Sequence, residues 1–69
     1  MYFTLLGQHK LDSKFEIIFG DYDLENVKDE KEAWKQTARY NETDFKSFRI
    51  IKSGDRQIQI DTVVNLLNA

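Results

Sequence analysis

The sequence predicts an α+β fold. We expect a small antiparallel sheet, made of an N-terminal hairpin plus a third and possibly a fourth strand, with one long helix packed on it and a short C-terminal helix. Two strand-like segments open the chain, a long segment with helical apolar spacing follows them, and no proline interrupts either pattern. We expect one domain over residues 1–69, since domains usually run from about 50 to 250 residues.

The first two expected elements are strands joined as a hairpin. Tyr2–His9 is rich in aromatic, Thr and Leu residues, which favour strands. Phe15–Phe19 alternates, which puts its first, third and fifth residues on one face. Asp12 and Ser13 supply a turn signal between them, and Gly20 is expected to end the second strand.

A long helix is expected next. Asp23 is a suitable N-cap, and acids crowd the first half of the segment while Lys35 and Arg39 lie near its end, the polarity that the helix dipole favours. Its apolar stripe falls within about 80° on the helix surface and consists of Leu24, Val27, Trp34 and Ala38. This narrow stripe indicates packing on one face of a sheet, and it favours a structural role for Trp34.

The remaining chain is less regular. Asn41–Asp44 has the composition of a loop, Phe45–Lys52 is expected to be the third strand, and Ser53–Asp55 is a turn signal. Gln57–Ile60 alternates as a fourth strand would, but it also continues into a helical pattern.

For this C-terminal segment we favour a strand or irregular backbone to Ile60 and a helix from about Asp61 to Asn68. A single helix from Asp55 onward would expose Ile58. We expect both helices on one face of the sheet.

No residue pattern indicates an enzyme, a metal site or a cofactor. His9 is the single histidine, there is no cysteine, and the glycines are too scattered for a phosphate loop. Asp21 and Asp23 form a possible carboxylate pair for a divalent cation or acid–base chemistry. Helix capping is the favoured interpretation, because a hard cation usually needs six or more oxygen ligands.

Charge is distributed unevenly along the chain. The net charge is −2, but residues 21–32 hold six acids and two bases, a local charge of −4. Residues 33–56 hold six bases and three acids, a local charge of +3. The chain is therefore acidic and then basic.

This profile favours a non-enzymatic protein-binding module over an enzyme. We expect it to contact another protein through an acidic helix face and neighbouring tyrosines: Tyr22, Glu25, Asp29, Glu32 and Tyr40. In its shortness, acidity and lack of a catalytic set, the chain resembles the small accessory proteins that viruses and mobile elements use to bind host machinery. Our hypothesis is therefore a phage-encoded accessory protein that binds or inhibits a host protein. No membrane-length apolar run occurs, so we expect no membrane contact and a cytoplasmic location.

Three alternatives stay open. A nucleic-acid-binding domain would use the basic segment Lys46–Arg56, with Lys46, Arg49, Lys52 and Arg56 as its phosphate contacts. The acidic stretch would instead suit a nucleic-acid mimic. A homodimer would pair an exposed sheet edge or aromatic face with itself.

Overall fold

The computed structural model describes residues 1–40 and 45–69, and the side chains of residues 37–40 lie outside that description. The loop expected at Asn41–Asp44 also lies outside it. The elements follow in the order ββαβα: β1 (Tyr2–His9), β2 (Phe15–Asp21), α1 (Leu24–Tyr40), β3 (Phe45–Ser53) and α2 (Gln57–Asn68). The strands form an antiparallel sheet in the order β2-β1-β3. The predicted α+β class is confirmed.

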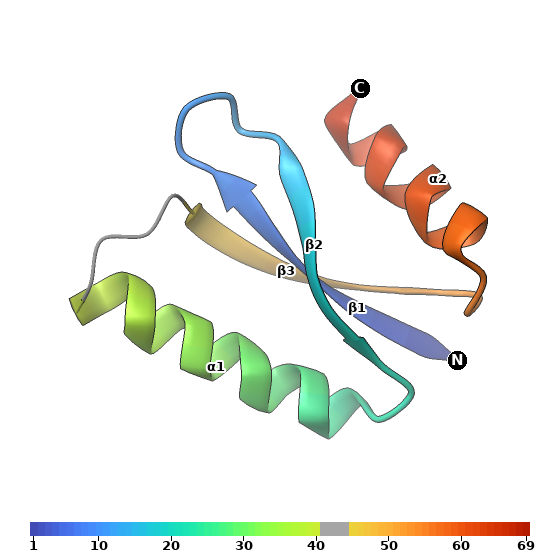
Figure 1. Cartoon of the computed structure of the whole chain (residues 1–69), viewed down its shortest axis with the longest axis horizontal. Helices are drawn as coiled ribbons and strands as arrows, with labels where there is room; N and C mark the ends of the chain where they lie inside the picture. Colours follow the sequence, from blue (N-terminus) through green and yellow to red (C-terminus); the bar gives the residue numbers. More distant parts are fainter. Residues whose placement is uncertain (41–44) are drawn as a thin grey trace.

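The two helices cover opposite faces of this sheet (Figure 1). In α2, Ile60 and Val64 form a buried cluster with Ile51 of β3, whereas Trp34 of α1 contacts Phe48 of the same strand. Residues 48 and 51 are an odd number of positions apart, so they point to opposite faces. The expectation that both helices share one face was therefore wrong.

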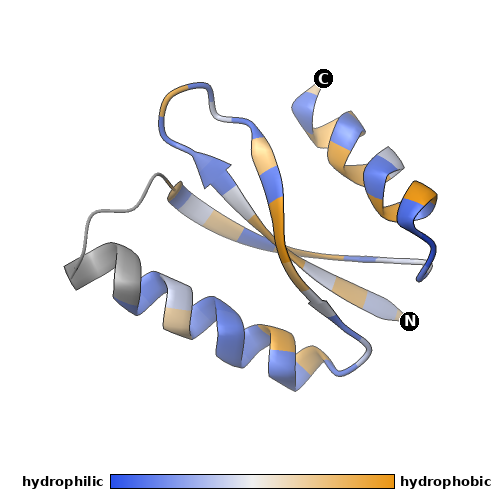
Figure 2. Cartoon of the chain, viewed as in Figure 1, coloured by the Kyte–Doolittle hydropathy of each residue, from blue (hydrophilic) through white to orange (hydrophobic). Residues whose placement is uncertain are grey.

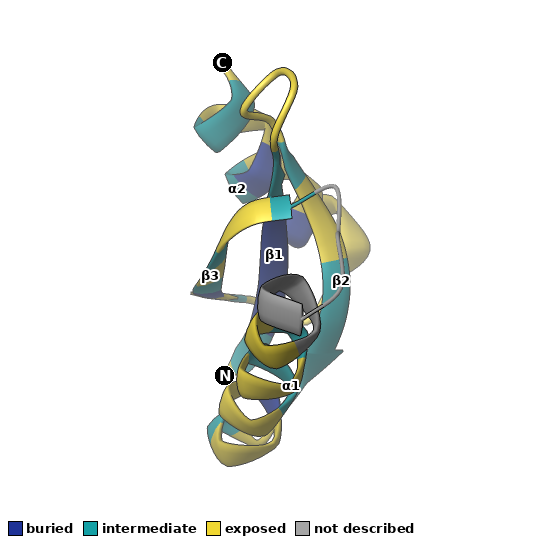
Figure 3. Ribbon diagram, turned by 90° about the vertical axis from the view of Figure 1, so that its left-hand side faces the viewer, coloured by how far each residue is buried: buried dark blue, intermediate teal, exposed yellow. Residues whose placement is uncertain are grey.

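The central strand explains why both faces need a cover. The adjacent residues Leu5 and Leu6 of β1 point to opposite faces, and both are fully buried. Burial is concentrated in β1, while the outer side of α1 is exposed (Figure 3). Burying each leucine side chain is favourable by about 1.5–3 kcal/mol relative to leaving it exposed to water. Two helices, one on each face, are the arrangement that buries both.

A bulge in β2 changes which side chains share a face. Leu5 pairs with Phe19 and Leu6 pairs with Ile17, so Ile18 is the extra residue between them. Phe19 and Ile17 consequently lie on opposite faces. The strand alternation predicted them on one face, and the bulge overturns that prediction.

Both outer strands run further than expected, because β1 still offers them backbone partners. β2 continues through Gly20 to Asp21, which pairs with Phe3. β3 continues to Ser53, which pairs with Tyr2. A second irregularity in register lies between Gln8 and His9, near the start of β3.

The C-terminal segment is one helix, and the fourth strand is absent among the described residues. α2 begins at Gln57, four residues earlier than expected, and Ile58 is 72% exposed, as a single helix requires. The burial of Ile60 and Val64, each worth about 1.5–3 kcal/mol, outweighs that exposure. Gln59 also accepts a hydrogen bond from the backbone N–H of Arg56 at 3.4 Å, which satisfies one N-terminal donor.

The two helices differ in character. Figure 2 shows α1 as mostly hydrophilic with a few apolar positions, whereas apolar positions are more frequent along α2. Over the residues described, neither helix has the length and apolarity that crossing a membrane would require.

Candidate functional site

One side of α1 is acidic and points away from the sheet. Glu25, Asp29 and Glu32 are all exposed, and they lie opposite the positions of the buried Val27 and half-buried Trp34. We call these three carboxylates the acidic side of α1. Their position agrees with the helical spacing, because residues at i, i+4 and i+7 share one side.

Two lysines neutralise this side only weakly. Lys28 lies 3.8 Å from Glu25, and Lys35 lies 3.9 Å from Glu32. Exposed pairs of this type contribute about 0.3–0.5 kcal/mol on a helix. All four side chains are more than half exposed, so both carboxylates remain accessible to a partner.

Tyr22 is exposed but is held away from the acidic side. Its hydroxyl donates a hydrogen bond of 2.7 Å to Oδ2 of Asp55, in the turn between β3 and α2. Its ring makes an edge contact with Tyr2 at a centroid distance of 5.0 Å. The hydrogen bond to Asp55 raises the pKa of Tyr22 above its usual value. The side chain of Tyr40, the other predicted tyrosine, lies outside the described residues.

The carboxylates of Asp21 and Asp23 accept hydrogen bonds at the start of α1. Asp23 accepts a hydrogen bond of 3.0 Å from the backbone N–H of Glu25, which is the expected cap. Asp21 accepts hydrogen bonds from the Asn26 amide at 3.0 Å and from the backbone N–H of Asp23 at 3.2 Å. These hydrogen bonds lower the pKa of Asp21 below its usual value, and the bond from Asn26 has the largest effect. Among the residues described, no group of three or more potential metal ligands occurs.

The side chain of His9 is half-buried and contacts Glu16 and Phe45. Its Nε2 atom lies 3.1 Å from a carboxylate oxygen of Glu16, and its ring lies 4.9 Å from the ring of Phe45. Nε2 of the imidazole is thus paired with Glu16, and the ring packs against Phe45 at a tilt of 41°. His9 therefore joins β1, β2 and β3 at one end of the sheet.

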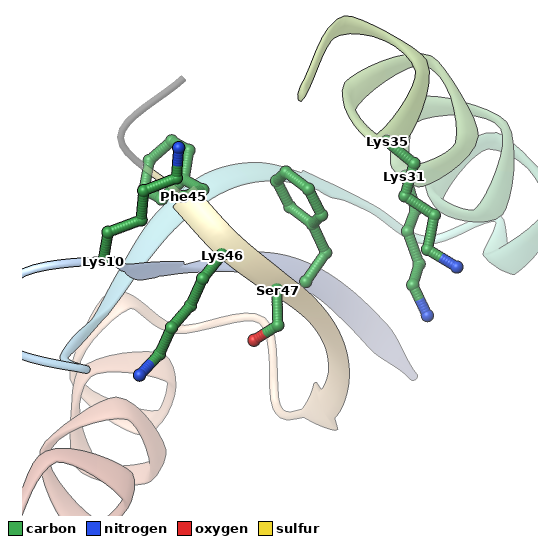
Figure 4. Close-up of a pocket in the computed structure, with 7 residues that line it drawn as sticks. Lys10, Lys31, Lys35, Phe45, Lys46 and Ser47 are labelled. Atoms are coloured by element: carbon green, nitrogen blue, oxygen red, sulfur yellow. The ribbon is translucent and has the colours of Figure 1, made fainter. Parts of the chain in front are cut away.

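An open groove between α1 and β3 is lined by four lysines (Figure 4). Its volume is about 630 Å³. We call it the lysine groove, and its lining residues are Lys10, Lys31, Lys35, Phe45, Lys46, Ser47 and Phe48. No carboxylate occurs among the described residues that line it. Lys31 and Lys35 come from α1, Lys10 follows β1, and the others come from β3.

Sequence reasoning found only part of this groove. It grouped the bases of β3 by their proximity in the chain, but strand alternation separates them. Arg49 pairs with Leu6 on the α2 face, and Lys52 pairs with Phe3 on the α1 face. The signal that could have found the groove is Lys31, a lysine in line with the apolar stripe of α1.

Comparisons with protein-family models, curated proteins and solved structures give no match for this chain.

Proposed function

We propose that the protein is a non-enzymatic, cytoplasmic protein-binding module, which recruits or inhibits a partner by docking it on the acidic side of α1. The observation that carries the proposal is the exposed row of Glu25, Asp29 and Glu32, on a helix side that none of the other described elements covers. A partner of complementary chemistry would present lysines and arginines to this row.

Binding is favoured over catalysis because the two aspartates and the histidine considered above for chemistry are already engaged. Asp21 and Asp23 close the start of α1, and His9 is paired with Glu16. An active site needs a nucleophile or base directed at open space where a substrate atom can lie. The acidic side offers charge for recognition and no such arrangement.

The contribution of the acidic side should be mainly electrostatic. Complementary charges at the rim of an interface speed association and select against wrong partners more than they raise affinity. They are also screened by salt, since the Debye length is about 8 Å at physiological ionic strength. We therefore expect a complex whose association rate falls as salt is added.

The test compares two variants with the same change in net charge. Glu25→Lys/Asp29→Lys reverses two charges on the acidic side and leaves Glu32 to its lysine neighbour. Glu30→Lys/Asp61→Lys reverses two charges elsewhere, on another side of α1 and on α2. Tagged wild type and both variants would capture proteins from the native host, and the affinity of the captured partner would then be measured with purified components.

We expect the first variant to bind the partner roughly 5- to 30-fold more weakly, because two exposed charge pairs contribute up to about 1 kcal/mol each. The control variant should bind as the wild type does. Equal binding by all three proteins would contradict the proposal. Release of the captured partner by competing duplex DNA would identify the acidic side as a nucleic-acid mimic.

A further inference from the structure

We infer that the lysine groove is a binding site for single-stranded nucleic acid. The site is separate from the acidic side of α1 and does not depend on the function proposed above. It differs from the basic segment considered in the sequence, because Lys46 is the only one of that segment's four proposed phosphate contacts that lines the groove. The juxtaposition that carries the inference is one groove lined by four lysines from three parts of the chain and by two phenylalanines.

The lysines of the groove are available to an anion. Within residues 1–40 and 45–69, Lys10 and Lys31 have no ion-pair partner, and Lys35 has only Glu32 at 3.9 Å. The ammonium group of Lys46 donates to the hydroxyl of Ser13, which carries no charge. Among the residues whose side chains are described, the one carboxylate near these cations is thus Glu32, at 3.9 Å from Lys35, and a phosphate entering the groove would meet lysines that it can pair with.

The two phenylalanines that line the groove pack against each other and against Trp34. Phe45 and Phe48 lie 5.9 Å apart and are half-buried, so each keeps part of its ring accessible. Trp34 contacts both rings, at 5.8 Å and 6.2 Å. Rings held in this way need little ordering when a base stacks on them, which lowers the entropic cost of binding.

This combination favours a single strand over other anions. Single-strand sites combine cations that follow the backbone with aromatic rings on which bases stack. A duplex hides the faces of its bases, and an acidic peptide would use the lysines without using the rings. The groove is within the range of about 300–1,000 Å³ typical of small-ligand sites, so we expect it to hold a short stretch of the strand.

The first experiment measures binding of a fluorescent oligothymidine of about 12 nucleotides, within the ~4–16 nucleotides that single domains of known single-strand-binding proteins cover. Affinity would be measured over a series of salt concentrations. For a strand that contacts three or four lysines, log K should fall against log salt with a slope of about −2 to −3, since each phosphate contributes about −0.7. Absence of binding at low salt would overturn the inference.

A matched pair of variants locates the site. Lys31→Gln/Lys35→Gln removes two cations from the groove, and Lys14→Gln/Lys28→Gln removes two lysines that do not line it. We expect the groove variant to bind roughly 10- to 100-fold more weakly and its slope to decrease in magnitude by about 1.4. The control should change little. Equal losses in both would show general attraction to charge and overturn the site.

A second pair of variants tests the stacking. Phe48→Leu keeps an apolar side chain but removes the ring, and Phe48→Tyr keeps the ring. We expect the leucine variant to bind about 5- to 150-fold more weakly and the tyrosine variant to bind like the wild type. Thermal unfolding of both variants separates lost stacking from lost folding. Equally tight binding of duplex DNA or of polyglutamate would overturn the assignment to a single strand.

Discussion

Asn68 allows a sharp test of how α2 is attached to the sheet. Its side-chain oxygen accepts a hydrogen bond of 2.6 Å from the backbone N–H of Phe15, and its side-chain nitrogen donates one of 3.1 Å to the Phe15 carbonyl. The amide of Asn68 thereby pairs with the first residue of β2 much as a neighbouring strand would. Asn68→Ala removes both bonds, and Asn65→Ala makes the same chemical change at an exposed position of the same helix.

The expected cost of Asn68→Ala follows from these two contacts. Each intramolecular hydrogen bond contributes a net of about 0.5–1.5 kcal/mol, so the variant should lose about 1–3 kcal/mol. A domain of this size has a total stability of roughly 3–10 kcal/mol, at about 0.05–0.15 kcal/mol per residue. Because 1 kcal/mol shifts Tm by about 4–8 °C in such a domain, the decrease should be easy to measure.

Two assays check the result. Urea unfolding gives the free energy of unfolding of wild type and both variants, and hydrogen exchange followed by NMR gives the protection of the Phe15 amide. We expect Asn68→Ala to destabilise the protein and to speed exchange at Phe15, while Asn65→Ala leaves both nearly unchanged. The reasoning is refuted if the two variants unfold alike, or if the Phe15 amide exchanges at the same rate in both.

Further predictions concern two titrating groups and one close contact. Because the pKa of Asp21 is lowered, its contribution to stability is present above the unfolded pKa and is lost as pH falls through the folded value; Asn26→Ala should raise that pKa in an NMR titration. Because the pKa of Tyr22 is raised, its contribution is present below the unfolded pKa and is lost as pH rises through the folded value. Asp55→Asn should lower that pKa in an ultraviolet titration, and an unchanged value would contradict the hydrogen bond. A Cβ atom at Gly7 would lie 2.6 Å from a ring carbon of Phe45, so Gly7→Val should destabilise the protein by about 1–3 kcal/mol in urea unfolding. Unchanged stability would show that the Phe45 ring can move aside.

Patterns within short segments of the sequence predicted several elements of the fold correctly. The β-rich composition of Tyr2–His9 predicted β1 with its observed bounds, and the N-cap at Asp23 predicted the start of α1. The acidic side of α1 was also predictable, because helical spacing alone decides which of its residues share a side. These features depend on neighbours within a few positions, which the sequence displays directly.

The start of α2 is an element that local sequence patterns predicted wrongly. The alternation of Gln57–Ile60 favoured a strand, and the exposure of Ile58 argued against a helix. Contacts with β1 and β3 decided otherwise, because burying Ile60 on Leu6 and Ile51 stabilises the helical backbone more than exposing Ile58 costs. Intrinsic preference is a weak guide where tertiary packing competes with it.

Local sequence patterns were sufficient to predict β1, the start of α1, the charge of each segment and the outward side of α1. The packing of distant elements, in contrast, places the helices on opposite faces of the sheet and brings Lys10, Lys31 and Lys46 to the lining of one groove. Those lysines belong to separate elements, so their proximity depends on strand order, register and the packing of α1 on β3. Such contacts between distant residues are set by burying both faces of β1, and no local pattern records them.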